Sequence, residues 1–284
     1  ITTLPCIDKL NPDYMDYIID SDDSVVVRWL KLGADGWRLD VANELDRDFW
    51  RAFKKATRQA DPESVMIGEI WESAESWLRG DMFDSAMNYD FRKNCRDFFG
   101  LEAINALEFS GRITDMMSRY PTGILQGQLN LLDSHDVNRF MSYCQNDIRR
   151  FRLAEVFLFT SPGAPSVFYG DELGMDGNSE FTLRGPMPWK GPKHDEREFF
   201  RQLITLRKEN EALMTGTFQT TAASESGLLI YRRELPGQKI TIALNGRNDT
   251  VSIGKCTPDR EAVLSYEFSG GTLGPFGYAI FVDQ

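Results

Sequence analysis

The sequence predicts an α/β fold, because three short apolar runs that read as buried strands each end on a carboxylate. The carboxylates are Asp40, Glu69 and Asp136, and helical stretches separate the three runs. An acidic side chain beside a buried strand is costly unless a site needs it. Three such acids suggest an α/β barrel, whose chemistry lies at the C-terminal rim of its parallel strands.

The composition narrows the classes of function. The chain has 284 residues, an apolar share of 42% and a net charge of −11. Nucleic acid favours a basic face and is therefore not expected as a partner. The negative net charge is compatible with a neutral sugar as substrate. An acidic surface that only keeps the protein soluble would give the same net charge. Without an apolar run of roughly 18 residues or a signal-peptide pattern, no membrane partner and a cytoplasmic location are expected.

The cysteines are widely spaced and form no C-x-x-C pair. They are Cys6, Cys95, Cys144 and Cys256. Buried free thiols in a reducing compartment are the favoured interpretation, rather than a disulfide framework.

Helical and strand-like segments alternate over the first two thirds of the chain. Asn11 and Pro12 suit the N-cap and first position of a helix that Gly33 ends. Apolar runs predict strands at 36–39, 65–70, 85–89, 129–132 and 166–169. Apolar periodicity predicts helices near 49–61, 91–99, 103–118, 148–159 and 199–206. Residues 174–192 are rich in Gly and Pro and read as a loop.

The pattern changes after about Leu213. Short apolar runs, separated by Gly, Asn, Asp and Pro, occupy residues 228–231, 240–244, 251–253, 262–264 and 278–281. These runs predict a small antiparallel β-sandwich domain over residues 213–284. The preceding residues, 1–212, then form a catalytic α/β domain.

The number of strands limits the barrel. About five strands alternate with helices, whereas a closed barrel needs eight. An open five-stranded parallel sheet would satisfy the count. A partial (β/α)8 TIM barrel that lacks its first three strands is the preferred interpretation, because of a resemblance carried by the strand-end motifs.

Those motifs read Gly-Trp-Arg-Leu-Asp-Val-Ala-Asn-Glu at 36–44, Gly-Glu-Ile-Trp at 68–71 and Asn-Leu-Leu-Asp-Ser-His-Asp at 130–136. They resemble the motifs of strands four, five and seven in the α-amylase family of glycoside hydrolases. The sequences of these motifs are most similar to those of the cyclomaltodextrinase, neopullulanase and maltogenic amylase branch of that family. Residues 165–175 resemble the strand-eight region, and residues 184–189 resemble the Arg-x-Pro-Met-x-Trp stretch that follows. Each motif is weak alone, but four in the right order are specific.

The resemblance implies a retaining glycoside hydrolase of α-1,4-linked glucans, with maltooligosaccharides, cyclodextrins and pullulan as substrates. Such an enzyme needs two carboxyl groups about 5–5.5 Å apart. By resemblance Asp40 is the nucleophile and Glu69 the acid/base. Asp136 would hold sugar hydroxyls more strongly as the ring flattens in the transition state.

Further residues are expected to bind the oligosaccharide. Arg38 precedes Asp40 by two positions, so both side chains point to one side of the strand and Arg38 would keep Asp40 ionised. By resemblance His135 would donate to a hydroxyl of the sugar that Asp136 holds. The candidates for neighbouring subsites are Asn43, Glu44 and Trp71, the last by stacking.

Structural roles compete with these assignments. Asp40 alone could be a helix N-cap, and Arg38 could form an ordinary ion pair. Asp171 and Glu172 could cap loops at the rim. The tryptophans Trp71, Trp77 and Trp189 are more often core residues than sugar platforms. With two histidines in the chain, no metal cluster is expected.

The chain departs from the family at its start. The family's strand-three motif, with an Asp, an Asn and a His, has no counterpart, so the chain is interpreted as the C-terminal part of a longer enzyme. Alone it is expected to be inactive or weakly active. Strands four and eight would be open edges, through which a homodimer could form. No cofactor is expected on this segment, although the family often binds calcium through the missing one.

Two other functions remain open. A non-catalytic carbohydrate-binding or scaffold protein could keep the same fold, but it could lose Asp40, Glu69 and Asp136 freely. A transglycosylase or an α-1,6-glucosidase relative would keep the three acids and differ in its products.

Overall fold

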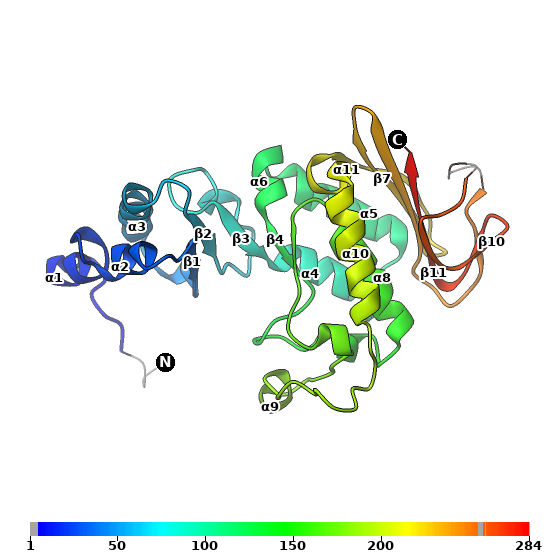
Figure 1. The fold of residues 1–284 in the computed structure, drawn as a ribbon, viewed down its shortest axis with the longest axis horizontal. Coiled ribbons are helices and arrows are strands. Elements are labelled where there is room, and N and C mark those ends of the chain that lie inside the picture. The colour runs from blue at the N-terminus through cyan, green and yellow to red at the C-terminus, as the bar shows by residue number, and fades with distance from the viewer. Residues whose placement is uncertain (1–4, 255–257, 259, 284) are drawn as a thin grey trace. The chain divides into compact units, whose positions relative to one another are not determined.

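A computed structural model describes residues 5–254, 258 and 260–283, which form two compact units (Figure 1). Among the described residues, unit 1 comprises 5–88 and 127–129, and unit 2 comprises 89–126, 130–254, 258 and 260–283. Strands alternate with helices up to residue 212 and an antiparallel sheet follows, so the predicted fold class is confirmed. The predicted domain boundary at residues 212 and 213 stays a prediction.

Unit 1 begins with helices α1 (Pro12–Met15), η1 (Asp16–Asp20) and α2 (Val25–Lys31). The Asn11 side chain accepts the N–H groups of Asp13 and Tyr14, which confirms the predicted N-cap. Gly33 has a φ of +100°, as a glycine that ends a helix should. The predicted single helix is wrong, because polar residues 21–24 interrupt it and Ser24 caps α2.

The strands of unit 1 are parallel. β1 (Gly36–Leu39) pairs with β2 (Val65–Gly68), and β2 pairs with β3 (Ser85–Asn88). Gly36 is opposite Val65, whose carbonyl oxygen would lie 2.0 Å from a Cβ at position 36. A side chain at that position would therefore force the two strands apart, and the close pairing requires glycine.

Helix α3 (Arg47–Ala60) connects β1 to β2 and follows η2 (Ala42–Glu44). It buries Phe49, Trp50 and Phe53, as the spacing predicted. Its polar contacts fix it against the strands, because Lys54 and Arg58 both pair with Asp84 just before β3. Burial opposes ionisation of Asp84, but these cations and the Met66 N–H lower its pKa.

The helices of unit 2 surround an aromatic core. They are α4 (Tyr89–Cys95), η4 (Arg96–Gly100), α5 (Ala106–Ser118), α7 (Phe140–Tyr143), α8 (Ile148–Thr160), α9 (Glu180–Leu183), α10 (Arg197–Glu209) and α11 (Glu211–Thr215). Helix α8 is buried along nearly its whole length. Phe91 stacks on Phe157 at 5.4 Å, and Phe98 stacks on Phe109 at 4.6 Å.

Shorter elements complete the α/β part. They are η3 (Glu75–Trp77), α6 (Thr122–Gly127), β4 (Leu129–Leu131), β5 (Ala164–Ser166) and η5 (Asp171–Leu173). The last strand ends three residues earlier than predicted, because residues 167–171 form a turn in which Asp171 accepts the Phe168 N–H at 3.1 Å.

The C-terminal sheet is antiparallel, as predicted (Figure 1). Its strands are β6 (Thr217–Ala223), β7 (Leu228–Leu235), β8 (Gln238–Asn245), β9 (Val251–Ser252), β10 (Leu264–Ser269) and β11 (Thr272–Asp283). The strand order is β10-β11-β8-β7-β6, and β9 pairs with β11. Leu229, Tyr231 and Ile242 join the helical core, whereas Ile230 and Ala243 point into a second apolar cluster. The sheet therefore buries both of its faces.

The cysteine prediction is confirmed in part. Cys95 and Cys144 are buried free thiols, and burial raises the pKa of each. Cys6 is also free but exposed, so its predicted burial is wrong. Cys256 lies outside the described residues.

Arg233 on β7 is fully buried and donates to backbone carbonyls. Its guanidinium binds Thr160 O at 2.6 Å, Leu213 O at 2.9 Å, Gly216 O at 3.0 Å and Thr217 O at 3.1 Å. Loss of hydration lowers its pKa to about 9, which still leaves it charged at neutral pH. One side chain therefore joins the end of α8 to the chain entering β6.

Replacing Arg233 tests this junction. Arg233→Met should lower the free energy of unfolding by about 3 kcal/mol, because three buried carbonyls and one partly buried carbonyl lose their donor. Urea unfolding followed by circular dichroism measures the change. Arg232→Met on the same strand, where the side chain is partly exposed, should cost less than about 1 kcal/mol. Equal losses for the two variants would contradict the role given to Arg233.

Candidate active site

Two of the three predicted acids lie at neighbouring strand ends of unit 1. Asp40 directly follows β1 and Glu69 directly follows β2. Leu39 pairs with Gly68, and the Glu69 N–H donates to Leu39 O at 2.8 Å. Because the two strands are parallel and in this register, both acids emerge at the same edge of the sheet, as the motifs predicted.

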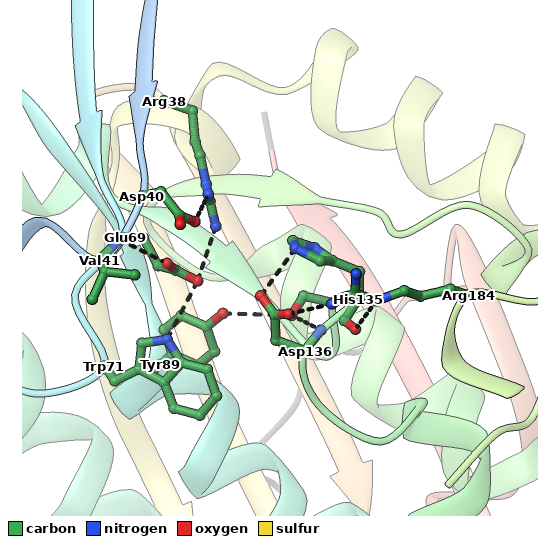
Figure 2. A network of polar contacts seen from close by, with 10 residues as sticks. Arg38, Asp40, Val41, Glu69, Trp71, Tyr89, His135, Asp136 and Arg184 are labelled. Atoms are coloured by element: carbon green, nitrogen blue, oxygen red, sulfur yellow. Dashed lines mark hydrogen bonds and ion pairs between the residues drawn. The ribbon is translucent and has the colours of Figure 1, made fainter. Parts of the chain in front are cut away.

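The two carboxylates have different surroundings (Figure 2). The Asp40 side chain is 71% exposed and pairs with Arg38 Nη1. The Glu69 side chain is 3% exposed, and Arg38 Nη2 lies 2.9 Å from its Oε1. Arg38 therefore bridges one acid that reaches solvent and one that is buried.

Glu69 accepts further hydrogen bonds. Val41 N–H donates to Oε2 at 3.0 Å, and Trp71 Nε1 donates to Oε1 at 3.3 Å. The interpretation of Asp40 as an N-cap is wrong, because the cap position of η2 is Val41 and no side chain caps it. Arg38 does form an ion pair, but with two candidate catalytic groups, so the structural and functional interpretations of Arg38 coincide.

The turn after Asp40 is strained. Val41 has φ 44° and ψ 45°, in the left-handed region that β-branched residues avoid. This conformation directs the Val41 N–H to the Glu69 carboxylate and the Ala42 N–H to Glu69 O at 3.1 Å. Trp50 Nε1 holds Ala42 O at 2.8 Å. The surrounding contacts therefore maintain a backbone conformation that costs energy and positions Glu69.

The predicted subsite residues of unit 1 are accessible to solvent. Asn43 and Glu44 lie on η2 and are exposed, and Trp71 is half-exposed while bonded to Glu69. Trp77 is partly buried beneath the Arg47 guanidinium, 4.3 Å from the ring centre.

Unit 2 holds Asp136 and His135 on the loop after β4. His135 Nε2 lies 3.0 Å from Asp136 Oδ2, and Arg184 Nη2 lies 2.9 Å from Asp136 Oδ1 (Figure 2). Arg184 Nε also donates to His135 O at 3.3 Å. Arg184 was not predicted as a site residue, although it opens the Arg-x-Pro-Met-x-Trp stretch that the sequence singled out.

Arg139 connects the loop that carries His135 and Asp136 to neighbouring segments. It is fully buried, donates to Tyr169 O at 2.8 Å and Leu183 O at 3.2 Å, and lies 4.4 Å from the Phe168 ring centre. Its backbone N–H donates to Gly177 O at 2.9 Å. One residue thus fixes the loop after β4 to the segment after β5.

Three buried acids, Asp133, Glu155 and Asp171, lie close enough to affect one another. Burial raises the pKa of all three. The charge of Asp133 raises the pKa of Glu155 and Asp171 further. Asp171 also accepts the Phe168 N–H, and Glu172 accepts the Gly170 N–H at 2.9 Å, which confirms both as rim-capping residues.

The described residues also test the expectations about metal ligands, membrane helices and Trp189. Within the described ranges, His, Cys, Asp and Glu side chains form no group of three suited to a metal ion. None of those same residues belongs to a helix with the length and apolar character of a membrane span. Trp189 is 82% exposed, so the expectation that it is a core residue is wrong.

Comparison with known sequences gives a consistent family match. The model described as "Alpha amylase, catalytic domain" matches residues 2–197. A cyclomaltodextrinase of Thermoanaerobacter pseudethanolicus is 39% identical over 245 residues, which cover 85% of this chain and 42% of the relative. Neopullulanase 2 of Thermoactinomyces vulgaris is 37% identical over 256 residues, which cover 89% and 43% respectively. The chain thus spans less than half the length of these relatives.

A solved structure is similar over nearly the whole chain. The acarbose-soaked debranching enzyme of Nostoc punctiforme has a TM-score of 0.85 and 30% sequence identity. The match covers 98% of this chain and 62% of that enzyme. The α/β part and the antiparallel sheet therefore both have counterparts in one enzyme.

Replacing Val41 tests the strain at the site. Val41→Gly should raise the free energy of unfolding by about 1 kcal/mol, because glycine adopts the left-handed conformation without steric cost. Val65→Gly, at an exposed valine in extended β2, should instead lower it by about 1 kcal/mol. Urea unfolding measures both variants. A destabilised Val41→Gly would show that Val41 is not strained.

Replacing Glu155 tests the buried acids. The pKa of Glu155 is raised in the folded state, so the unfolded chain loses this proton at a lower pH than the folded chain. The free energy of unfolding therefore falls as pH rises above about 4.5. In the pH range where only the folded wild type holds the proton, this loss amounts to up to about 1.4 kcal/mol per pH unit. Glu155→Gln should remove it. Unfolding measured from pH 5 to pH 8 checks this. Exposed Glu209→Gln should leave the pH dependence unchanged; if Glu155→Gln does the same, Glu155 is not protonated in the fold.

Proposed function

The chain belongs to the α-amylase family of glycoside hydrolases, and on this premise we propose that it carries the catalytic residues of a retaining hydrolase of α-1,4-linked glucans. The observation that carries the proposal is the Arg38 bridge between Asp40 and Glu69 at adjacent strand ends. A retaining mechanism needs one carboxylate that attacks and a second group that transfers protons.

The surroundings of each acid suit one role. Asp40 is exposed and pairs with Arg38, so its carboxylate is accessible and oriented to attack the anomeric carbon. Glu69 protonates the leaving glycosidic oxygen and then takes a proton from the water that releases the sugar from Asp40. In this cycle Arg38 pairs with whichever acid is ionised, and the Val41 N–H keeps Glu69 oriented.

The remaining site residues bind the glucan. Arg184 and His135 fix both oxygens of Asp136, so its carboxylate is oriented before sugar hydroxyls arrive. The exposed positions of Asn43, Glu44 and Trp71 support contacts with neighbouring sugars, with Trp71 stacking against one of them.

The substrate class follows from the relatives. Similarity to a cyclomaltodextrinase and a neopullulanase supports cyclodextrins, pullulan and maltooligosaccharides as substrates. Because the chain spans less than half of either relative, we propose that it is inactive or weakly active by itself. The scaffold alternative is disfavoured by the intact ion-paired acids, and a transglycosylase or α-1,6-glucosidase would differ in its products.

Three expectations remain predictions. A homodimer could form through strand edges, since β5 is exposed or half-exposed along its length. Calcium could bind in a longer protein that contains this chain. A cytoplasmic location is likewise still to be tested.

Asp40→Asn tests the nucleophile. In a protein that contains this chain and hydrolyses maltoheptaose, the variant should lose several powers of ten in rate, each worth about 1.4 kcal/mol of barrier. Reducing-sugar release measures turnover, and Asp20→Asn, at an exposed position, is the matched control. A fully active Asp40→Asn variant would overturn the assignment.

The isolated chain provides a second test. Its turnover of β-cyclodextrin, pullulan and maltotriose should be low or absent, because the chain spans less than half the length of the cyclomaltodextrinase and neopullulanase relatives. Product analysis by chromatography would separate hydrolysis from transfer, which yields longer glucans, and from cleavage of α-1,6 bonds. Rapid turnover by the isolated chain would show that no further segment is needed.

A further inference from the structure

Two aromatic rings protrude from the segment after β5. Phe181 is 89% exposed and Trp189 is 82% exposed, the two highest values among the large apolar side chains of the described residues. Exposed aromatic rings of this kind offer flat apolar surface to a ligand. Neither ring has a role in the site described above.

The segment that carries Phe181 is held firmly in place. Ser179 and Thr182 form a capping box at the start of α9, and Leu183 is buried. Arg139 donates to Leu183 O at 3.2 Å and, through its backbone, to Gly177 O at 2.9 Å. The Phe181 ring is thus presented by an anchored helical turn, so that little freedom is lost when a ligand binds it.

Phe181 is linked to the Asp136 loop through Arg184. Arg184 directly follows α9, three positions after Phe181. Arg184 reaches Asp136 Oδ1 at 2.9 Å and His135 O at 3.3 Å (Figure 2). Tyr169 Oη donates to Gly185 O at 2.7 Å, which ties down the chain that leads to Trp189.

We propose that Phe181 and Trp189 form an aromatic platform that binds the glucan chain beyond the sugar held by Asp136. Sugars present apolar C–H faces as well as hydroxyls, and flat aromatic side chains combine apolar area with few rotatable bonds. The platform would favour long glucans over short ones. The ligand class rests on the proposed function, but the binding does not require hydrolysis.

Binding of glucans of two lengths tests the platform. Isothermal titration calorimetry with maltoheptaose and maltose is performed in an Asp40→Asn background, so that the ligand is not consumed. Phe181→Ala should weaken maltoheptaose binding roughly tenfold, about 1.4 kcal/mol, and leave maltose binding unchanged. Phe181→Tyr should retain binding. Trp29→Ala, which removes an exposed ring from α2, should have no effect.

A spectroscopic readout tests Trp189 separately. Maltoheptaose should change the intrinsic tryptophan fluorescence, and Trp189→Ala should reduce that change and leave the part due to Trp71; an unchanged response would exclude Trp189 from the platform. The circular dichroism spectra and unfolding midpoints of Phe181→Ala and Trp189→Ala should match those of the parent. A match shows that both variants are folded.

The outcomes separate the platform from the catalytic proposal. The platform is overturned if maltoheptaose does not bind at millimolar concentration, or if Phe181→Ala binds both glucans as the parent does. It is also overturned if Phe181→Ala alters only self-association in sedimentation, since the rings would then form an interface between copies. If Asp40→Asn keeps full turnover in an active protein that contains this chain, while Phe181→Ala still weakens maltoheptaose binding, the catalytic assignment fails and the platform stands.

Discussion

Unit 2 depends on buried and partly buried arginines whose guanidinium groups donate to backbone carbonyls. A helix leaves its last carbonyls without partners, and a buried turn does the same. Arg233 satisfies Thr160 O at the end of α8, and Arg207 satisfies Phe159 O and Ser161 O beside it. Arg139 does the same for the turns after β5. Each guanidinium has several donors in a fixed plane, so one side chain can join segments that are distant in sequence.

In unit 1, arginine contacts acids. Arg38 lies between a solvent-accessible carboxylate and a buried one, where its two nitrogens give each acid one contact. The strained turn at Val41 adds a backbone donor to the buried acid. Unit 2 therefore uses arginine to bury polar backbone, whereas unit 1 uses it to keep two acids oriented and chemically distinct. The difference follows from the partners that surround each guanidinium.

The sequence predicts best where burial repeats regularly or where a residue has one dominant conformational use. The apolar runs located β1 and β2, and Asn11 and Gly33 marked helix ends. Strand β6 was missed because its threonines do not form an apolar run, and α9 was missed because a capping box makes a helical turn within a Gly-rich and Pro-rich segment. Motifs placed Asp40 and Glu69 at strand ends. They could not show that Arg38 contacts both, because that depends on how β1 and β2 are paired.

The buried acids Glu155 and Asp171 also couple folding to the binding of protons. Burial and the charge of Asp133 raise the pKa of Glu155 and of Asp171, so above the usual pKa of a carboxyl group the folded chain holds protons that the unfolded chain releases to the buffer. The heat of unfolding measured by calorimetry will therefore include the ionisation enthalpy of the buffer. Phosphate and Tris, which differ in that enthalpy, should report different apparent enthalpies for the same transition, and the difference counts the protons stored in the core.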